Sequence, residues 1–215
     1  MSERRPYRRE SEERRREDLI LAALDLIAEG GPQAATVRAI AEKAGVTPGL
    51  IRHYFLTKED LTRAAYLRLM DQMICDSVTV LSVAPTDPVA RLAAFVAASI
   101  SPPVVDPVTV GLWAGFLYGI RSQPAMREVH AATYLNFRDT LQSLIEALPH
   151  AATSVQLRQQ AIACNAVIDG LWLEGSVLPE AFDAGEIVTI GLTSVGAILN
   201  VELLTVYQAT HRTLP

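Results

Sequence analysis

The feature that most constrains this 215-residue chain is the stretch from residue 36 to residue 56, TVRAIAEKAGVTPGLIRHYFL. In its first half, apolar residues recur with the i, i+3, i+4, i+7 spacing that places them on one face of an α-helix. These residues are Val37, Ile40, Ala41 and Ala44. Thr36 can cap the start of this helix, and Gly45 can adopt the left-handed conformation that ends it. The sequence therefore predicts a short helix followed by a tight turn.

A second short helix is predicted directly after the turn. Thr47 can cap its start, and Pro48 suits the first helical position, where a missing amide hydrogen costs little. The helix continues through Leu50, Ile51 and Tyr54, which makes about two turns. Because so short a helix is marginal by itself in water, we expect a larger helical scaffold to hold it and to present its other face outward.

The outward face of the second helix carries side chains that suit a DNA major groove. Arg52 can bridge a guanine edge or a phosphate, Thr47 can contact a thymine methyl group, and Gly49 permits close approach to a sugar-phosphate strand. Pro48 and His53 lie on the same face. Hairpins of this kind also occur in proteins that never bind DNA, so spacing alone leaves a helical scaffold protein without DNA binding as an alternative.

The pattern T-x-x-x-I-A-x-x-A-G-V-T-x-G-x-I-x-x-Y-F-x-x-K-E-x-L, read from Thr36 to Leu61, resembles the DNA-binding signature of the TetR family of bacterial repressors. In that family the residues matching Tyr54 and Lys58 contact phosphate, and a half-buried core ring is the alternative role for Tyr54. The resemblance implies binding of double-stranded operator DNA. The predicted DNA-binding residues are Thr36, Thr47, Pro48, Gly49, Arg52, His53, Tyr54 and Lys58.

Length and composition favour one small and one larger domain, because 215 residues, half of them hydrophobic, can bury a large core. No uncharged run exceeds 15 residues, and the runs 107–120 and 187–201 have 14 and 15, fewer than the ~20 that a membrane helix needs. Seven arginines precede residue 17, but no apolar stretch follows them as in a secretory signal. We therefore predict a cytoplasmic protein that does not enter a membrane.

The net charge of −5 is unevenly distributed. Residues 1–70 contain 13 Lys and Arg against 11 Asp and Glu, or +2, whereas residues 71–215 contain 6 against 13, or −7. Phosphate contact requires only locally positive charge, and an acidic remainder restrains indiscriminate binding. Cys75 and Cys164 are too far apart in the sequence to indicate a disulfide framework or a metal site, so both are predicted to be packed thiols.

The sequence predicts an all-α fold in three parts. Residues 1–10 are charged and lack a periodic apolar face, so they are predicted to be a flexible basic arm. Residues 11–56 are predicted to form an amino-terminal three-helix helix-turn-helix DNA-binding domain. Residues 57–215 are predicted to form a larger helical ligand-binding and dimerisation domain.

The first helix is predicted over residues 11–29, with Gly30 and Gly31 ending it. Arg14, Arg15 and Arg16 at its start are secondary candidates for phosphate contact, and a solvated charge run is the equal alternative.

In the larger domain, Thr57 can cap a long helix, and prolines divide the chain that follows. The segment 108–120 is apolar on every side and is predicted to lie at the centre of this domain. The last two long helices are predicted to pair with their copies in a homodimer, as the family resemblance implies. Five more helices are predicted after the one that Thr57 caps. They span about 87–100, 106 onward, 124–148, 154–177 and 183–207.

Residues 112–144 and 166–173 (AVIDGLWL) resemble the BetI-like branch of the family, whose members respond to choline. A quaternary ammonium has no N–H to donate and is favoured by aromatic faces and a carboxylate, which Asp169 or Glu174 can supply. The alternative is that these aromatic side chains only fill a core and that Asp169 bonds a backbone amide or lies at the dimer seam. The predicted ligand-binding residues are Trp113, Phe116, Tyr134, Phe137, Asp169 and Trp172.

These observations predict a transcriptional regulator that is released from its operator by a small-molecule effector, either a choline-like cation or an unrelated lipophilic, drug-like compound. An enzyme is not expected, because the four histidines are scattered and no cluster has metal-ligand or nucleophile spacing. No metal and no cofactor are predicted. The operator sequence, the regulated genes and the identity of the effector are not specified by the sequence.

Overall fold

The computed structural model describes residues 4–149 and 151–212, and this part of the chain consists of α-helices and short 3₁₀ turns without a β-strand. The prediction of an all-α fold is therefore confirmed. The helices are α1 (Arg4–Gly30), α2 (Val37–Lys43), α3 (Pro48–Tyr54), α4 (Lys58–Thr79), α5 (Pro88–Ser99), α6 (Pro107–Ser122), α7 (Pro124–Glu146), α8 (Ser154–Val177), α9 (Glu186–Leu199) and α10 (Leu203–Arg212). None of the described helices is long and apolar enough to cross a membrane.

The chain divides into two compact units, which we describe separately. Unit 1 comprises Met1–Met70 and Leu112–His130, and unit 2 comprises Asp71–Gly111 and Ala131–Pro215. The predicted boundary between residues 56 and 57 differs from this division, because the first half of α4 and parts of α6 and α7 belong to unit 1. The assignment of DNA binding to 11–56 and of ligand binding to 57–215 stays a prediction about function.

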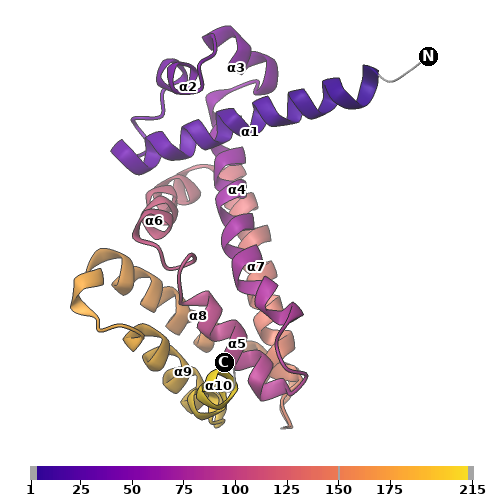
Figure 1. Ribbon diagram of the computed structural model, residues 1–215, viewed down its shortest axis with the longest axis vertical. Helices are drawn as coiled ribbons and strands as arrows, with labels where there is room; N and C mark the ends of the chain where they lie inside the picture. The colour runs from indigo at the N-terminus through magenta and orange to yellow at the C-terminus, as the bar shows by residue number, and fades with distance from the viewer. Residues whose placement is uncertain (1–3, 150, 213–215) are drawn as a thin grey trace. The chain divides into compact units, whose positions relative to one another are not determined.

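In unit 1, α2 and α3 lie together on one side of α1 (Figure 1). The Thr36 hydroxyl accepts from the Ala39 amide at 3.1 Å, as a helix cap does. Gly45 has φ +65°, and the Val46 amide donates back to the Ala41 carbonyl at 2.9 Å. The predicted cap and the predicted glycine turn between the two helices are both confirmed.

The predicted arm at residues 1–10 is largely wrong in its secondary structure, because α1 begins at Arg4; residues 1–3 lie outside the described part of the chain. Arginine and glutamate are good helix formers, and Glu10–Arg14 and Glu12–Arg16 have the favourable i, i+4 spacing. Pro6 falls in the first turn, where proline is tolerated. Helix propensity outweighs the missing apolar face.

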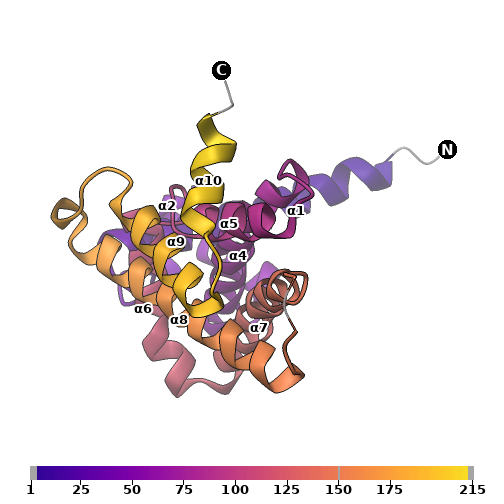
Figure 2. The same cartoon turned by 90° about the horizontal axis from the view of Figure 1, so that it is seen from below.

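Unit 2 contains α5, α8, α9 and α10, with α8 beside α9 and α10 beside both α9 and α5 (Figure 2). Helix α5 begins at a capping Asp87, whose carboxylate accepts from the Ala90 amide at 2.8 Å. The predicted apolar stripe of α8 is buried as expected. Its members are Leu157, Ala161, Cys164, Ile168 and Leu171.

Three predictions about the chain beyond the hairpin are wrong. Segment 108–120 is not enclosed on every side: Val108 is 58% and Tyr118 is 82% exposed, and most of the segment belongs to unit 1. The last predicted helix is two helices, because Asn200 takes a left-handed conformation, φ +56°, that ends α9. Cys75 is exposed rather than packed, whereas Cys164 is buried.

Candidate functional site

Helix α3 presents a polar face to solvent, and most of the predicted DNA-binding residues lie on or beside it. Tyr54 and Lys58 are half-buried. The edge of the His53 ring meets the Tyr54 ring, with centroids 5.1 Å apart. The exposed members of the predicted set are Thr36, Thr47, Pro48, Gly49, Arg52 and His53.

Thr47 occupies the cap position of α3, as predicted, but its hydroxyl makes no capping hydrogen bond. The reason is local geometry: the Leu50 amide donates to the Thr47 carbonyl at 3.0 Å, so this amide does not need the side chain. Pro48 at the first helical position removes another donor. The Thr47 hydroxyl is therefore not engaged in capping, and its residue is exposed.

The opposite face of α3 holds the hairpin on its scaffold. Ile51 is 2% and Phe55 is 5% exposed. The guanidinium carbon of Arg16, on α1, lies 5.0 Å from the centroid of the Phe55 ring. On α2, the Lys43 ammonium is 2.6 Å from the Glu29 carboxylate, and this hydrogen bond raises the pKa of Lys43. The sequence did not predict these two contacts to α1.

A second cluster lies in unit 2, where α7 faces α8. The Tyr134 hydroxyl donates to Asp169 Oδ2 at 3.0 Å, and the Asn165 amide nitrogen donates to the same oxygen at 2.8 Å. Asn165 Nδ2 is also 2.7 Å from the Tyr134 oxygen. Burial raises the pKa of Asp169 to about 6, although both hydrogen bonds act in the opposite direction. No described residue donates to Asp169 Oδ1.

Aromatic rings lie on the same two helices, one helical turn from the polar cluster. The centroid of Phe137 is 6.0 Å from the Trp172 ring and 5.2 Å from the Phe95 ring. Trp172 Nε1 donates to the Ser99 carbonyl at 2.6 Å. Because Ser99 ends α5, the indole satisfies a carbonyl that has no partner within its own helix.

Four of the six predicted ligand-binding residues thus share the α7–α8 face of unit 2, namely Tyr134, Phe137, Asp169 and Trp172. Trp113 and Phe116 are buried in unit 1, where Phe116 packs on Tyr66 with centroids 5.0 Å apart. Their role in ligand binding stays a prediction.

Sequence reasoning left Asp169 and Glu174 as alternative charges and did not name Asn165. Glu174 is exposed and Asp169 is half-buried, with its Oδ1 atom shielded from solvent. Asn165 is 1% exposed. The sequence spacing could have identified Asn165 as a partner of Asp169, because Asn165 precedes Asp169 by four residues and therefore shares its side of α8. A buried amide at this spacing is a natural partner for such a carboxylate.

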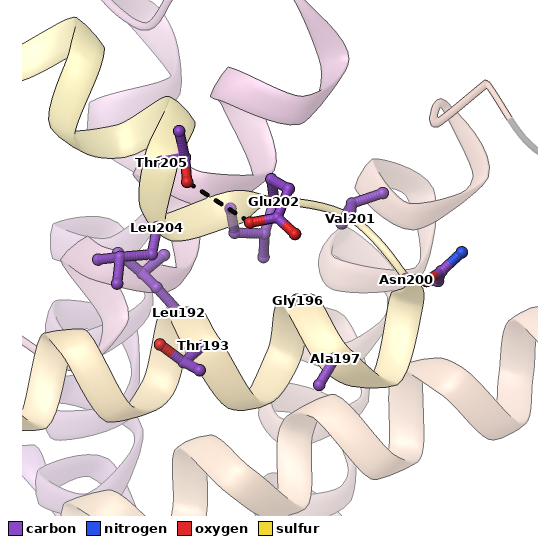
Figure 3. Close-up of a pocket in the computed structure, with 10 residues that line it drawn as sticks. Leu192, Thr193, Gly196, Ala197, Asn200, Val201, Glu202, Leu204 and Thr205 are labelled. Atoms are coloured by element: carbon purple, nitrogen blue, oxygen red, sulfur yellow. Dashed lines mark hydrogen bonds between the residues drawn. The ribbon is translucent and has the colours of Figure 1, made fainter.

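Two cavities of unit 2 are lined by residues other than those of this cluster. One, of about 320 Å³, lies where the chain turns from α9 into α10, and its residues include Gly196, Asn200 and Glu202 (Figure 3). The other, of about 550 Å³, is lined by residues of α4 and α7, among them Asp71, Cys75 and Asn136. Within the described residues, no group of three or more metal-ligating side chains is present.

Helices α2 and α3, joined by the turn at Gly45, form a helix-turn-helix, the DNA-binding motif of a large class of transcriptional regulators. A family model for bacterial regulatory proteins of the TetR family matches residues 19–65, and one for the carboxy-terminal part of BetI-type transcriptional repressors matches residues 88–200. The chain belongs to the TetR family and carries a BetI-type carboxy-terminal domain. It is a transcriptional regulator and not an enzyme, as predicted.

Individual relatives agree with this assignment. The chain is 31% identical over 174 residues to the HTH-type transcriptional regulator BetI 2 of Chromohalobacter salexigens, covering 80% of this chain and 82% of that protein. It is 32% identical over 171 residues to the regulator BetI of Stenotrophomonas maltophilia, covering 79% and 85%.

Solved structures show the same fold. A transcriptional regulator from Pseudomonas aeruginosa PAO1 superposes with a TM-score of 0.80 at 30% identity, over 90% of this chain and 94% of that chain. A regulator from Saccharomonospora viridis, solved in complex with choline, superposes with a TM-score of 0.66 at 19% identity, over 86% and 95%. At that identity the second match supports the fold alone.

Proposed function

We propose that this protein is a cytoplasmic, homodimeric repressor that binds operator DNA through α3 and is released by a small organic cation. The observation that supports DNA binding is the composition of the α3 surface. Its exposed face presents Arg52, His53 and the Thr47 hydroxyl, which makes no capping hydrogen bond, while Ile51 on the other face is buried. Family membership supports the same role.

The proposed contacts divide by chemistry. Arg52 and Thr47 contact base edges, because a guanidinium can bond guanine bidentately and a threonine methyl can pack on thymine. Tyr54 and Lys58, at the end of α3 and the start of α4, position the hairpin on phosphates. Gly49 lets the start of α3 approach the strand, and Thr36, Pro48 and His53 line the edge of this surface.

Replacing Arg52 by Ala tests the proposed base contact. We expect the affinity for a duplex selected from a random pool by the wild-type protein to fall by about 1–3 kcal/mol, with weak binding to a scrambled duplex unchanged. Fluorescence anisotropy at one fixed salt concentration measures both. Arg121→Ala, which removes an exposed arginine on α6, is the control. Equal binding of both duplexes by the wild-type protein would contradict sequence-specific recognition.

The proposed dimer rests on an apolar surface that α8 leaves exposed. Its exposed side chains recur at helical spacing, and Gly170 within the row permits close approach of a second helix. Ile190 and Ile198 of α9 are also partly exposed, at 38% and 37%. The exposed large apolar residues of α8 are Val155, Ile162, Leu173 and Val177. A surface of this kind is typical of a subunit interface.

We expect sedimentation equilibrium to give a dimer at micromolar concentration and Leu173→Glu to shift it to monomer, because a carboxylate would be buried without a partner. Val83→Glu is the matched control, since Val83 is 82% exposed and lies outside α8 and α9. A monomeric wild-type protein would exclude the proposed dimer.

The proposed effector is a quaternary ammonium or a similar small cation. Asp169 offers a half-buried carboxylate whose shielded Oδ1 atom receives no hydrogen bond from a described residue, and the Phe137 and Trp172 rings lie on the same two helices. Aromatic faces attract such cations. The choline-bound regulator of Saccharomonospora viridis is consistent with this ligand class. A neutral lipophilic effector is the alternative, and it would not require Asp169 to be ionised.

The proposed switch is a shift between two conformations of the dimer that differ in the spacing of the two α3 helices. The effector needs only a modest preference for the conformation that fits DNA poorly, because about 1.4 kcal/mol changes operator affinity tenfold. A choline titration that saturates the protein but leaves operator affinity unchanged would contradict this mechanism.

A further inference from the structure

We infer that the effector carries at least one N–H on its charged nitrogen, and that Asn165 binds this protonated amine together with Asp169. The inference rests on the proposed cation site between α7 and α8, and it narrows the class of ligand that this site takes. It also assigns a ligand contact to Asn165, which has no role in the proposed function. Two side-chain oxygens without a hydrogen-bond donor carry the inference.

The two oxygens belong to neighbouring side chains of α8. Asp169 Oδ1 and Asn165 Oδ1 are both shielded from solvent, and no described residue donates a hydrogen bond to either atom. Asn165 is 1% exposed, and its Nδ2 atom donates to Asp169 Oδ2 at 2.8 Å. Buried polar atoms in native proteins nearly always have a partner. Two shielded acceptors within one hydrogen-bonded pair therefore point to a donor that a ligand supplies.

The donors of this cluster are already used. An asparagine amide has two N–H groups and a tyrosine hydroxyl has one O–H. Asn165 Nδ2 lies 2.8 Å from Asp169 Oδ2 and 2.7 Å from the Tyr134 oxygen, and the Tyr134 hydroxyl donates to Asp169 Oδ2 at 3.0 Å. Turning the Asn165 amide over would set its oxygen against the Asp169 carboxylate, where two acceptors repel. The three side chains therefore have no donor left for the Oδ1 atoms.

The basic side chain of Arg138, on α7, does not supply the donor either. Burial raises the pKa of Tyr134 to about 12, and the charge of Arg138 acts in the opposite direction, so Arg138 is near the cluster. It donates to neither shielded oxygen. The groups that donate to Asp169 are an amide and a hydroxyl, both neutral. The negative charge of Asp169 therefore has no cationic hydrogen-bond partner among the described residues.

A protonated amine can satisfy these acceptors, whereas a quaternary ammonium cannot. Each N–H of an ammonium group can form a charge-assisted hydrogen bond, which is about twice as strong as a bond between neutral groups. A quaternary nitrogen is covered by four alkyl groups and has no N–H. It is held only by its charge and by the faces of Phe137 and Trp172. Choline therefore remains a ligand of the site, but it binds more weakly than an amine of the same shape.

The cluster meets solvent at one end. Tyr134 and Asp169 are half-buried, whereas Asn165 is buried. A ligand therefore meets Asp169 first, and rotation of the carboxylate turns Oδ1 toward it. An amine with one N–H bonds Asp169, and a second N–H is needed to bond Asn165 Oδ1 as well. The number of N–H groups on the nitrogen should therefore raise the affinity in two steps.

The test uses a series of ligands with one skeleton, one hydroxyl and one charge: choline, N,N-dimethylethanolamine, N-methylethanolamine and ethanolamine. Each methyl group removed adds one N–H, and the amines are protonated at pH 7.5 as a lysine side chain is. Calorimetric titration of the full-length protein measures each affinity. The variants are Asn165→Ala, Asp169→Asn and, as the matched control, Asn136→Ala, which removes an exposed asparagine of α7. Circular dichroism verifies that each variant is folded.

We expect N,N-dimethylethanolamine to bind the wild-type protein about tenfold more tightly than choline, because one hydrogen bond to a charged group contributes roughly that factor. N-Methylethanolamine should bind roughly tenfold more tightly again. Ethanolamine should gain little more, since its third N–H has no acceptor in this cluster. Asn165→Ala should lose the second gain, Asn136→Ala should keep both, and Asp169→Asn should weaken binding of every ligand in the series.

Failure of this inference is distinguishable from failure of the proposed function. If choline binds and Asp169→Asn weakens it, but the amines bind no more tightly than choline, the inference is overturned and the proposed cation site stands. If Asn165→Ala keeps the second gain, Asn165 is not a ligand contact. If Asp169→Asn weakens none of the ligands, or if none binds, the cation site and the inference are both wrong. The wild-type series decides even if Asn165→Ala does not fold.

Discussion

Replacing Asp169 by Asn is expected to weaken choline binding by roughly 30-fold or more, because the cationic ligand loses a half-buried negative charge as its partner. The same change should stabilise the ligand-free protein. Burial raises the pKa of Asp169 to about 6 from its ordinary value of 3.8, so the ionised carboxylate is less favourable in the folded state than in the unfolded state. The ionised Asp169 carboxylate is therefore expected to favour choline binding and to lower the stability of the ligand-free protein.

The pH dependence of the stability effect has a definite sign. Between pH 4 and 6 the folded protein holds the Asp169 proton more tightly than the unfolded chain, so wild-type stability falls as pH rises through this range. Above about pH 7 the loss is complete, and the asparagine variant should be more stable by about 2 kcal/mol. At pH 4 the two proteins should unfold at nearly the same denaturant concentration.

Urea unfolding at pH 4 and pH 8 measures the stability difference, and calorimetric titration at pH 8 measures choline affinity. Asp139→Asn removes an exposed carboxylate from α7 and should change neither. Choline affinity that survives in the Asp169→Asn variant would exclude the proposed cationic site and favour a neutral effector.

Trp172 is expected to have the second large effect, because it is 5% exposed and bonded to the end of α5. Trp172→Ala should lower the free energy of unfolding by about 3–5 kcal/mol through loss of buried volume. Trp172→Phe retains a ring but leaves the Ser99 carbonyl without its indole donor, which should cost about 1–3 kcal/mol. Urea unfolding at pH 8 measures both.

The same pair of variants separates two roles of the indole. If Trp172 forms part of a cation site, Trp172→Phe should bind choline more weakly, since tryptophan presents the better face to a cation. If it only fills the core, the Phe variant should lose stability and keep its choline affinity. Comparing calorimetric titration with the unfolding curve distinguishes these outcomes.

The hairpin of α2 and α3 could be predicted closely from local chemistry. A capping Thr36 and a left-handed Gly45 act within a few residues of themselves, so their effects do not depend on the rest of the fold. The same holds for α7 and α8, whose predicted bounds differ little from those found. The error at Thr47 was also local. The Leu50 amide donates to the Thr47 carbonyl and not to the Thr47 hydroxyl, which was expected to cap the helix.

Errors of another kind arose where packing decides. The apolar composition of 108–120 suggested a central helix, but Tyr118 is exposed, because composition does not say which sides of a helix find neighbours. The break at Asn200 was missed because asparagine is compatible both with a helix interior and with the left-handed conformation that it adopts here.

What the sequence by itself determined is most of the helices, the turn between α2 and α3, and the family signature, since each depends on residues close together in the chain. Only the tertiary structure decided that Tyr134, Asn165 and Asp169 share one hydrogen-bonded cluster and that Arg16 meets Phe55. The physical reason is that these contacts join residues of different helices, and helical periodicity fixes the face on which a side chain lies without fixing the helix that it meets.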